Sequence, residues 1–347
     1  MLDRERDFRS DTVTLPTQSM REAMFRCTVG DDVLGEDPAM NELEAFAADL
    51  LRREAALFVP SGTFGNQCAI LTHTHSGDEV VACETCHVVQ HEVGAAALIA
   101  RANVRAVPPH NGRHLELADI LPRLREGQDI HYPRTALVCL EQATAMGEVY
   151  PMETMEEIHA CCRSRDIRVH VDGARLFNAA TALNIDPWRM AACCDSVSVC
   201  LSKGLCAPVG SLLVGDREFI ARARKNRKLL GGGMRQAGFL AAAGLVALKE
   251  MRSRLAEDHE NAQLLARLLS AIPGVVVTRT PAINMVFARF DAPLDHLQVE
   301  AALREKGMAV YPPEMGEYRF VTHLGIDAAD VKALAREIAR LVSVEGR

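Results

Sequence analysis

Short apolar runs alternate with amphipathic segments along most of this 347-residue chain. Each run has four to six residues, too few for a helix, and several carry β-branched side chains, which favours strands. The predicted strands are 55–59, 79–82, 104–107, 136–140, 168–171 and 196–201. Helical spacing lies between them, at 64–74, 91–99, 115–126, 155–164 and 176–183. This alternation predicts an α/β fold with a doubly wound, mainly parallel sheet whose loops gather at one edge.

The pattern changes in the last third of the chain. A long helical segment, 237–269, leads into strands at 275–278, 285–290 and 319–322 and helices at 296–306 and 328–341. A chain of this length exceeds one typical domain. We therefore expect two domains: residues 1–250, an N-terminal extension with helices 17–24 and 39–52 and the large α/β domain, and residues 251–347, a smaller α+β domain.

Two strands end in residues that suit one chemistry. The strand 168–171 runs into Asp172, and the strand 196–201 runs into Ser202 and Lys203. A helical crossover of this length indicates a parallel βαβ unit, whose functional groups gather at the carboxyl ends of the strands. A lysine amine forms a Schiff base with a carbonyl, and pyridoxal phosphate needs an acidic partner for its ring nitrogen. From this stretch alone, a helix-capping Asp172 and a solvated Lys203 stay an alternative.

Two further segments suit an anion. The turn Ser61-Gly62-Thr63 precedes a predicted helix, so its backbone amides, hydroxyls and helix dipole fit a phosphate; an ordinary N-cap is the alternative. The chain has no Gly-Lys-Ser/Thr run, which excludes a nucleotide P-loop. The basic segment 225–236, KNRKLLGGGMRQ, carries three consecutive glycines. It could cradle an anion across a subunit boundary or form a mobile surface loop.

Charge and hydropathy exclude several classes of protein. The net charge of -7 argues against a nucleic-acid partner or an anionic membrane surface. Apolar runs stay far below the roughly 20 residues of a membrane span. The first residues, MLDRERDFRSD, are charged and lack the apolar core of a signal peptide. We expect a cytoplasmic protein.

Eleven cysteines without a secretory signal predict reduced thiols, mostly in the core. Cys83-Glu84-Thr85-Cys86-His87 matches the c-type haem attachment pattern, and His91 could complete a zinc set. No export signal or second ligand pair supports either, so a non-catalytic haem, metal or redox protein is the minor alternative and no metal is expected. The acidic loop 29–38, VGDDVLGEDP, could hold a cation, but a solvated turn is the favoured interpretation.

Six segments together resemble a known family. In order, they are FRSDTVT from Phe8, VGDDVLGEDP from Val29, ALFVPSGTFGN from Ala56, HVDGARLFNA from His170, SVSVCLSKGLCAPVGS from Ser196 and LGGGMRQAG from Leu230. They resemble the L-threonine aldolases, pyridoxal-phosphate enzymes of the β-eliminating lyase group with the aspartate-aminotransferase fold. The resemblance covers nearly the whole chain.

The resemblance implies a role for each matching position. Lys203 would carry the cofactor, Asp172 would pair with its ring nitrogen and His87 would stack on the ring. Phosphate binding is implied for the turn Ser61-Gly62-Thr63, with Lys228 and Arg235 reaching the phosphate from a neighbouring subunit. The family is typically a homotetramer built as a dimer of dimers, so a homo-oligomer is expected here.

Substrate binding is implied for a second set. Ser10, Arg175 and Arg319 would gather the carboxylate of an amino acid, because the planar arginine fork matches its two oxygens. Arg175 would also touch the phenolic oxygen of the cofactor. An aldolase of this kind cleaves a β-hydroxy-α-amino acid to glycine and an aldehyde.

Three positions depart from the family, and all concern the pocket for the substrate side chain. Thr144 stands where the family carries a histidine that contacts the substrate hydroxyl, while Leu34 and His91 each replace a common tyrosine. We therefore expect an aldolase with a different β-hydroxy substrate and another base, either His91 or a water. The alternative is β-elimination, racemisation or transamination of another amino acid, since the same cofactor supports all of these.

Overall fold

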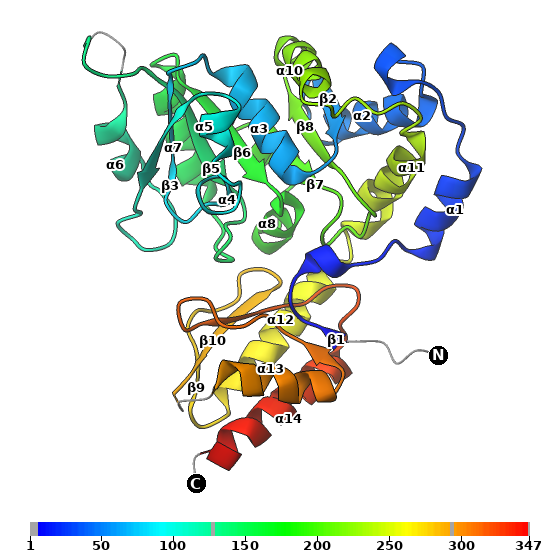
Figure 1. Cartoon of the computed structure of the whole chain (residues 1–347), viewed down its shortest axis with the longest axis vertical. Helices are drawn as coiled ribbons and strands as arrows, with labels where there is room; N and C mark the ends of the chain where they lie inside the picture. Colours follow the sequence, from blue (N-terminus) through cyan, green and yellow to red (C-terminus); the bar gives the residue numbers. More distant parts are fainter. Residues whose placement is uncertain (1–5, 126–128, 292–294, 346–347) are drawn as a thin grey trace. The chain divides into compact units, whose positions relative to one another are not determined.

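The computed structural model describes residues 6–125, 129–291 and 295–345. The described chain divides into two compact units. The larger unit is Pro16–Arg252, and the smaller joins residues 6–15 to residues 253–345. In Figure 1 the smaller unit is coloured yellow to red, apart from its blue N-terminal strand. Within the described residues, no helix combines the length and the apolar character that crossing a membrane requires.

A seven-stranded sheet forms the centre of the larger unit, in the order β2-β8-β7-β6-β5-β3-β4. Its strands are β2 (Ala55–Val59), β3 (Glu79–Cys83), β4 (Asn103–Val107), β5 (Thr135–Glu141), β6 (Arg168–Gly173), β7 (Ser196–Cys200) and β8 (Ser211–Gly215). All pairs are parallel except the two that β8 makes. The six predicted strands and the mainly parallel α/β fold are confirmed; β8 was not predicted.

The larger unit also has helices, some of which pack on the sheet and some on other helices. They include α1 (Gln18–Arg26), α2 (Pro38–Leu50), α3 (Gly62–His73), α7 (Met152–Arg163), α8 (Leu176–Leu183), α9 (Pro187–Ala191) and α10 (Arg217–Leu229). Helix α3 contacts β6, β7, β8 and α10. The resulting core holds Leu57, Leu213 and Phe219 almost without exposure. Burial of one such side chain stabilises the fold by roughly 1.5–3 kcal/mol, so α3 is firmly placed.

The predicted helix 91–99 is wrong. Two short helices, α4 (His87–Gln90) and α5 (Ala95–Leu98), flank a break where Val93 has φ 56° and Gly94 has φ 68°. The break directly follows Glu92, whose buried carboxylate bonds to side chains of the interior, including His87.

Other helix predictions are too long. The segment 237–269 forms α11 (Gly238–Val246), a π-helical turn η4 (Ala247–Met251) and α12 (Leu255–Ser270). It breaks at Arg252, whose guanidinium donates to the Leu248 carbonyl (2.6 Å) that a continuing helix would use. The segment 115–126 holds α6 (Leu117–Ile120) and a 3-10 turn, η3 (Leu121–Arg123); residue 126 lies outside the described residues. Residues 225–229 of the predicted basic loop belong to α10.

The smaller unit carries a three-stranded antiparallel sheet, ordered β12-β10-β9, and helices around it. Its elements are β9 (Val275–Val277), β10 (Met285–Phe290), α13 (His296–Glu305), β12 (Tyr318–Val321) and α14 (Ala328–Glu345). The strand β1 (Arg6–Asp7) pairs with β11 (Met308–Ala309), and Phe8 is fully buried in this unit's core. Residues 6–15 therefore fold with the smaller unit, although the sequence analysis grouped them with the large domain.

Candidate active site

Polar side chains gather where the parallel strands end. His87 follows β3, Glu141 ends β5, Asp172 is the last but one residue of β6, and Lys203 comes three residues after β7. The register pairs Glu141 with Asp172 and Asp172 with Ser198. Because these strands are parallel, their carboxyl ends share one edge of the sheet. Asp172 and Lys203 thus come from neighbouring strand ends, as the sequence predicted.

Asp172 is buried and held by two hydrogen bonds. The backbone N–H of Ala174 donates to Oδ1 (3.0 Å), and Nδ2 of Asn66 donates to Oδ2 (2.7 Å). A hydrogen bond to a charged group contributes about 1.5–3 kcal/mol. The carboxylate is therefore fixed in one orientation at the sheet edge.

His87 lies beside this carboxylate with a third of its side chain exposed. Its Nδ1 is 2.8 Å from Oε1 of Glu92, and its backbone N–H donates to Oε1 of Glu141 (3.3 Å). The hydrogen bond to Glu92 raises the pKa of His87; burial opposes this, the charge on Asp172 adds to it and the charge on Lys203 lowers it. A carboxylate oxygen of Asp172 lies within 4.8 Å of a ring nitrogen of His87, so this charge is beside the imidazole.

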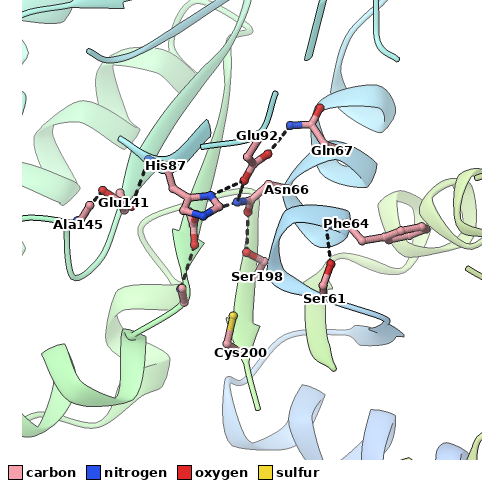
Figure 2. A network of polar contacts seen from close by, with 12 residues as sticks. Ser61, Phe64, Asn66, Gln67, His87, Glu92, Glu141, Ala145, Ser198 and Cys200 are labelled. Atoms are coloured by element: carbon pink, nitrogen blue, oxygen red, sulfur yellow. Dashed lines mark hydrogen bonds and ion pairs between the residues drawn. The ribbon is translucent and has the colours of Figure 1, made fainter. Parts of the chain in front are cut away.

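Four polar residues of this site were not predicted from the sequence: Asn66, Gln67, Glu92 and Glu141. Asn66, on α3, donates from Nδ2 to both Asp172 and Oε1 of Glu92 (2.8 Å). Gln67 donates to the other oxygen of Glu92. Figure 2 shows Glu92, Asn66 and His87 pointing toward one another. The available signals were two adjacent polar residues in α3, Asn66 and Gln67, and an acid five residues after His87.

Glu141 is a second unusual carboxyl group. Its oxygens accept the backbone N–H groups of His87 (3.3 Å) and Ala145 (2.8 Å). Burial, followed by the nearby charge on Asp172, raises the pKa of Glu141 to about 7. Two carboxyl groups side by side on neighbouring strands do not both ionise readily near neutral pH.

The N-terminus of α3 forms the predicted turn. Ser61 is its N-cap, and its Oγ accepts the backbone N–H of Phe64 (3.2 Å). A Cβ on Gly62 would lie 2.8 Å from Sγ of Cys200, so no larger residue fits there without a shift. The first N–H groups of a helix have no intrahelical acceptor, and with the dipole they favour an anion. Phosphate binding by Ser61, Gly62 and Thr63 stays a prediction.

The residues predicted to bind the substrate carboxylate belong to both units. Arg175 is buried at the N-cap of α8, in the larger unit. Ser10 and Arg319 belong to the smaller unit, where Ser10 caps a 3-10 turn and Arg319 lies in β12. A carboxylate site made by all three stays a prediction.

Lys228 and Arg235 were predicted to reach a phosphate from another subunit. Lys228 is exposed in the last turn of α10, and Arg235 pairs with Asp31 (2.8 Å). Their role toward a phosphate stays a prediction.

The acidic loop is not a solvated turn. Asp32 and Asp37 are buried: Asp32 pairs with Arg227 (2.8 Å), and Asp37 caps α2 and accepts the N–H of Gly238 (2.8 Å). Because these carboxylates bond to Arg227 and Gly238, they tie the loop to α10 and α11.

The three departures from the family occupy different surroundings. Oγ1 of the buried Thr144 accepts the backbone N–H of Glu148 (3.1 Å), so this hydroxyl closes a turn. The ring of His91 is exposed and its centroid lies 5.5 Å from that of His87. Leu34 is 66% exposed in a 3-10 turn. Of the three, His91 is the group beside His87 that can transfer a proton.

Cys83 and Cys86 do not belong to a group of potential metal ligands among the described residues. Cys83 and Cys86 are buried, and burial raises the pKa of the Cys86 thiol far above its ordinary value. Among the described residues, one set of three potential ligands has atoms within 4.8 Å of one another: His87, Glu92 and Asp172. Neither cysteine belongs to it, and its members already bond to one another or to Asn66.

Comparison with known proteins shows which protein family this chain belongs to. Residues 7–292 match the model of the beta-eliminating lyase family. The low specificity L-threonine aldolase of Escherichia coli K12 is 41% identical over 331 residues, which cover 95% of this chain and 97% of that protein. The structure of a Leishmania major threonine aldolase superimposes with a TM-score of 0.84 at 22% identity, covering 97% and 99% of the two chains. A structure of SPT with bound PLP gives 0.76 at 19% identity, covering 99% and 88%.

Proposed function

Because this chain belongs to the beta-eliminating lyase family and, within it, to the L-threonine aldolases, we propose that it cleaves a threonine-like β-hydroxy-α-amino acid to glycine and an aldehyde. The family resemblance of the six sequence segments is thereby confirmed. The observation that carries the proposal is the placement of Asp172 and Lys203 at the ends of neighbouring strands, with His87 beside Asp172.

The residues at this edge fit pyridoxal phosphate. Lys203 offers an amine for the cofactor's aldehyde, and the fixed carboxylate of Asp172 would hold a proton at the ring nitrogen. The turn at Ser61 offers backbone N–H groups and a hydroxyl to a phosphate, and Gly62 is small enough for close approach. When bound, the cofactor supplies an electron-withdrawing ring that stabilises negative charge on the substrate's α-carbon.

Substrate binding and proton transfer would come from the chain's own side chains. Ser10, Arg175 and Arg319 would bind the substrate carboxylate. The proposed base for the β-hydroxyl is His91, because Thr144 accepts a backbone hydrogen bond and His91 carries an exposed imidazole next to His87. General base catalysis contributes roughly 10²–10⁴-fold, so an enzyme without such a base would be slow.

We further propose a cytoplasmic homo-oligomer, built as a dimer of dimers. Lys228 and Arg235 would then meet the phosphate of a neighbouring subunit. The support is that both lie in or after the basic end of α10, with exposed side chains.

A product assay tests the proposed reaction. Purified protein loaded with pyridoxal phosphate is given threonine, allo-threonine, phenylserine and hydroxyaspartate, and glycine and ammonia are measured together. We expect glycine without ammonia from at least one of them. The Lys203→Ala variant should no longer form glycine. Lys332→Ala, which removes an exposed lysine from α14, should still form it. Ammonia without glycine would show elimination instead and refute the aldolase.

A further inference from the structure

The carboxylate of Glu92 is the centre of a buried network behind His87. It is 1% exposed and accepts three side-chain donors: Nδ1 of His87 (2.8 Å) and Nδ2 of Asn66 (2.8 Å) at Oε1, and Nε2 of Gln67 at Oε2. A buried carboxylate is costly unless hydrogen bonds compensate it. These three donors account for its place in the interior.

The orientation of Asn66 follows from its other partners. Its Oδ1 accepts the Ser198 hydroxyl (2.8 Å) and lies 3.1 Å from Nε2 of His170. Its Nδ2 faces the carboxylates of Glu92 and Asp172. The reversed amide would set its oxygen against both carboxylates, so the observed orientation is the stable one. Asn66 thus joins the two carboxylates rigidly.

A further chain of side chains supports that orientation. Since Oδ1 of Asn66 only accepts, Nε2 of His170 carries a proton, and Nδ1 of His170 accepts from the Ser196 hydroxyl (2.9 Å). Ser196 in turn lies 2.8 Å from Nε2 of His73. Burial lowers the pKa of His170 to about 4 and holds that of His73 well below its ordinary value. Both rings are therefore neutral, and the donor and acceptor roles along the chain are consistent.

The same reasoning fixes the proton on His87. A carboxylate oxygen can only accept, so the bond to Glu92 requires a proton on Nδ1. That leaves Nε2 as the ring nitrogen that gains and loses a proton. The titratable groups whose charge can act on the ring are Glu92 on its own segment, Glu141 on β5, Asp172 on β6, Lys203 after β7 and the neighbouring His91.

We propose that Glu92 is a positioning residue for His87: it holds the proton on Nδ1, fixes the ring beside Asp172 and leaves Nε2 to exchange a proton at the site. The inference rests on the proposed function in one respect, that this proton then serves the reaction. Asn66 supports it, because it holds Glu92 and Asp172 at a constant separation.

The rate of chemical modification of His87 tests this role of Glu92 without any substrate. Diethyl pyrocarbonate reacts with the neutral imidazole, so the rate at His87, followed by peptide mass spectrometry across pH, reports its protonation. The variants are Glu92→Gln, which removes the charge, and Glu92→Asp, which keeps the charge but withdraws the carboxylate. The control is Glu84→Gln, the same change at an exposed residue three positions before His87. All are measured on the full chain, with and without pyridoxal phosphate.

The account predicts that Glu92→Gln moves the modification profile of His87 to lower pH. The rate should rise several-fold at about pH 6, below the ordinary imidazole pKa. The profile of Glu92→Asp should lie between those of Glu92→Gln and the unaltered protein. The profile of Glu84→Gln should match that of the unaltered protein.

A Glu92→Gln profile that matches the unaltered protein would overturn the proposal, even if its thermal stability fell. If this variant does not fold, an unchanged profile in Glu92→Asp overturns it instead. Failure of the proposed function would appear separately, as absent glycine from a protein whose His87 profile still depends on Glu92.

Discussion

Replacing Glu141 by glutamine should change how stability depends on pH. In the folded protein the pKa of Glu141 is about 7, above its ordinary 4.5, because the group is buried and lies beside Asp172. The folded state therefore binds this proton more tightly than the unfolded state does. The resulting stability is fully present below about pH 4.5 and is lost as the pH rises through about 7.

The size of the effect follows from that difference. A pKa raised from 4.5 to about 7 means that the contribution of Glu141 to the free energy of unfolding falls by roughly 3 kcal/mol between pH values below 4.5 and above about 7. With about 2.1 cal/mol/K of unfolding entropy per residue, a chain of this length has an entropy of about 0.7 kcal/mol/K. The contribution of Glu141 to Tm is then about 4 °C. Glutamine keeps the size of the side chain and cannot ionise.

Calorimetry at about pH 5 and about pH 8 measures this, with both proteins in the same cofactor state. Other groups also titrate in this range, so we compare the change in Tm with pH of the unaltered protein with that of Glu141→Gln. The Tm of the unaltered protein should fall about 4 °C further than that of Glu141→Gln. Glu84→Gln is the control, since its carboxylate is exposed. Parallel profiles for Glu141→Gln and the unaltered protein would refute the assignment of a raised pKa to this group.

Three substitutions test the site itself. Asp172→Ala should stay folded by circular dichroism yet lose nearly all turnover, because the ring nitrogen of pyridoxal phosphate would lose its acidic partner. Near-normal turnover would contradict this role of Asp172. Thr144→His should raise kcat/KM for threonine by placing a histidine where the family carries one, at a cost of about 1 kcal/mol for the lost turn hydrogen bond; no gain would count against the proposed change in the substrate pocket. Gly62→Ala should weaken cofactor binding in a fluorescence titration and lower stability by about 1–3 kcal/mol, since its Cβ would meet Cys200 Sγ at 2.8 Å; unchanged affinity and Tm would refute the close packing.

The sheet could be predicted because its strands are continuous apolar runs. β3, β5, β6 and β7 are buried along most of their lengths, and Asp172 and Lys203 follow such runs directly. The short run Ser211–Gly215 carried the same signal but directly follows a Pro- and Gly-containing turn. Of its two antiparallel partners, β7 is the strand just before it in the chain, but β2 is distant in sequence.

The network behind His87 could not be predicted in the same way. Asn66 and Glu92 join elements that approach only in the folded chain, and the spacing of Glu92 fits an exposed helical position equally well. Similarly, Asp32 and Asp37 read as solvated acids because their partners lie about 200 residues away, on α10 and α11. Long-range hydrogen bonds of buried polar groups leave no local pattern.

The most direct test of the central claim is the site of cofactor attachment. Protein purified with pyridoxal phosphate is reduced with borohydride, digested and analysed by mass spectrometry, so that the modified lysine is identified. The account predicts a pyridoxyl group on Lys203 and on no other lysine. Modification of another lysine in a protein that binds the cofactor stoichiometrically, or no covalent attachment at all, would contradict it.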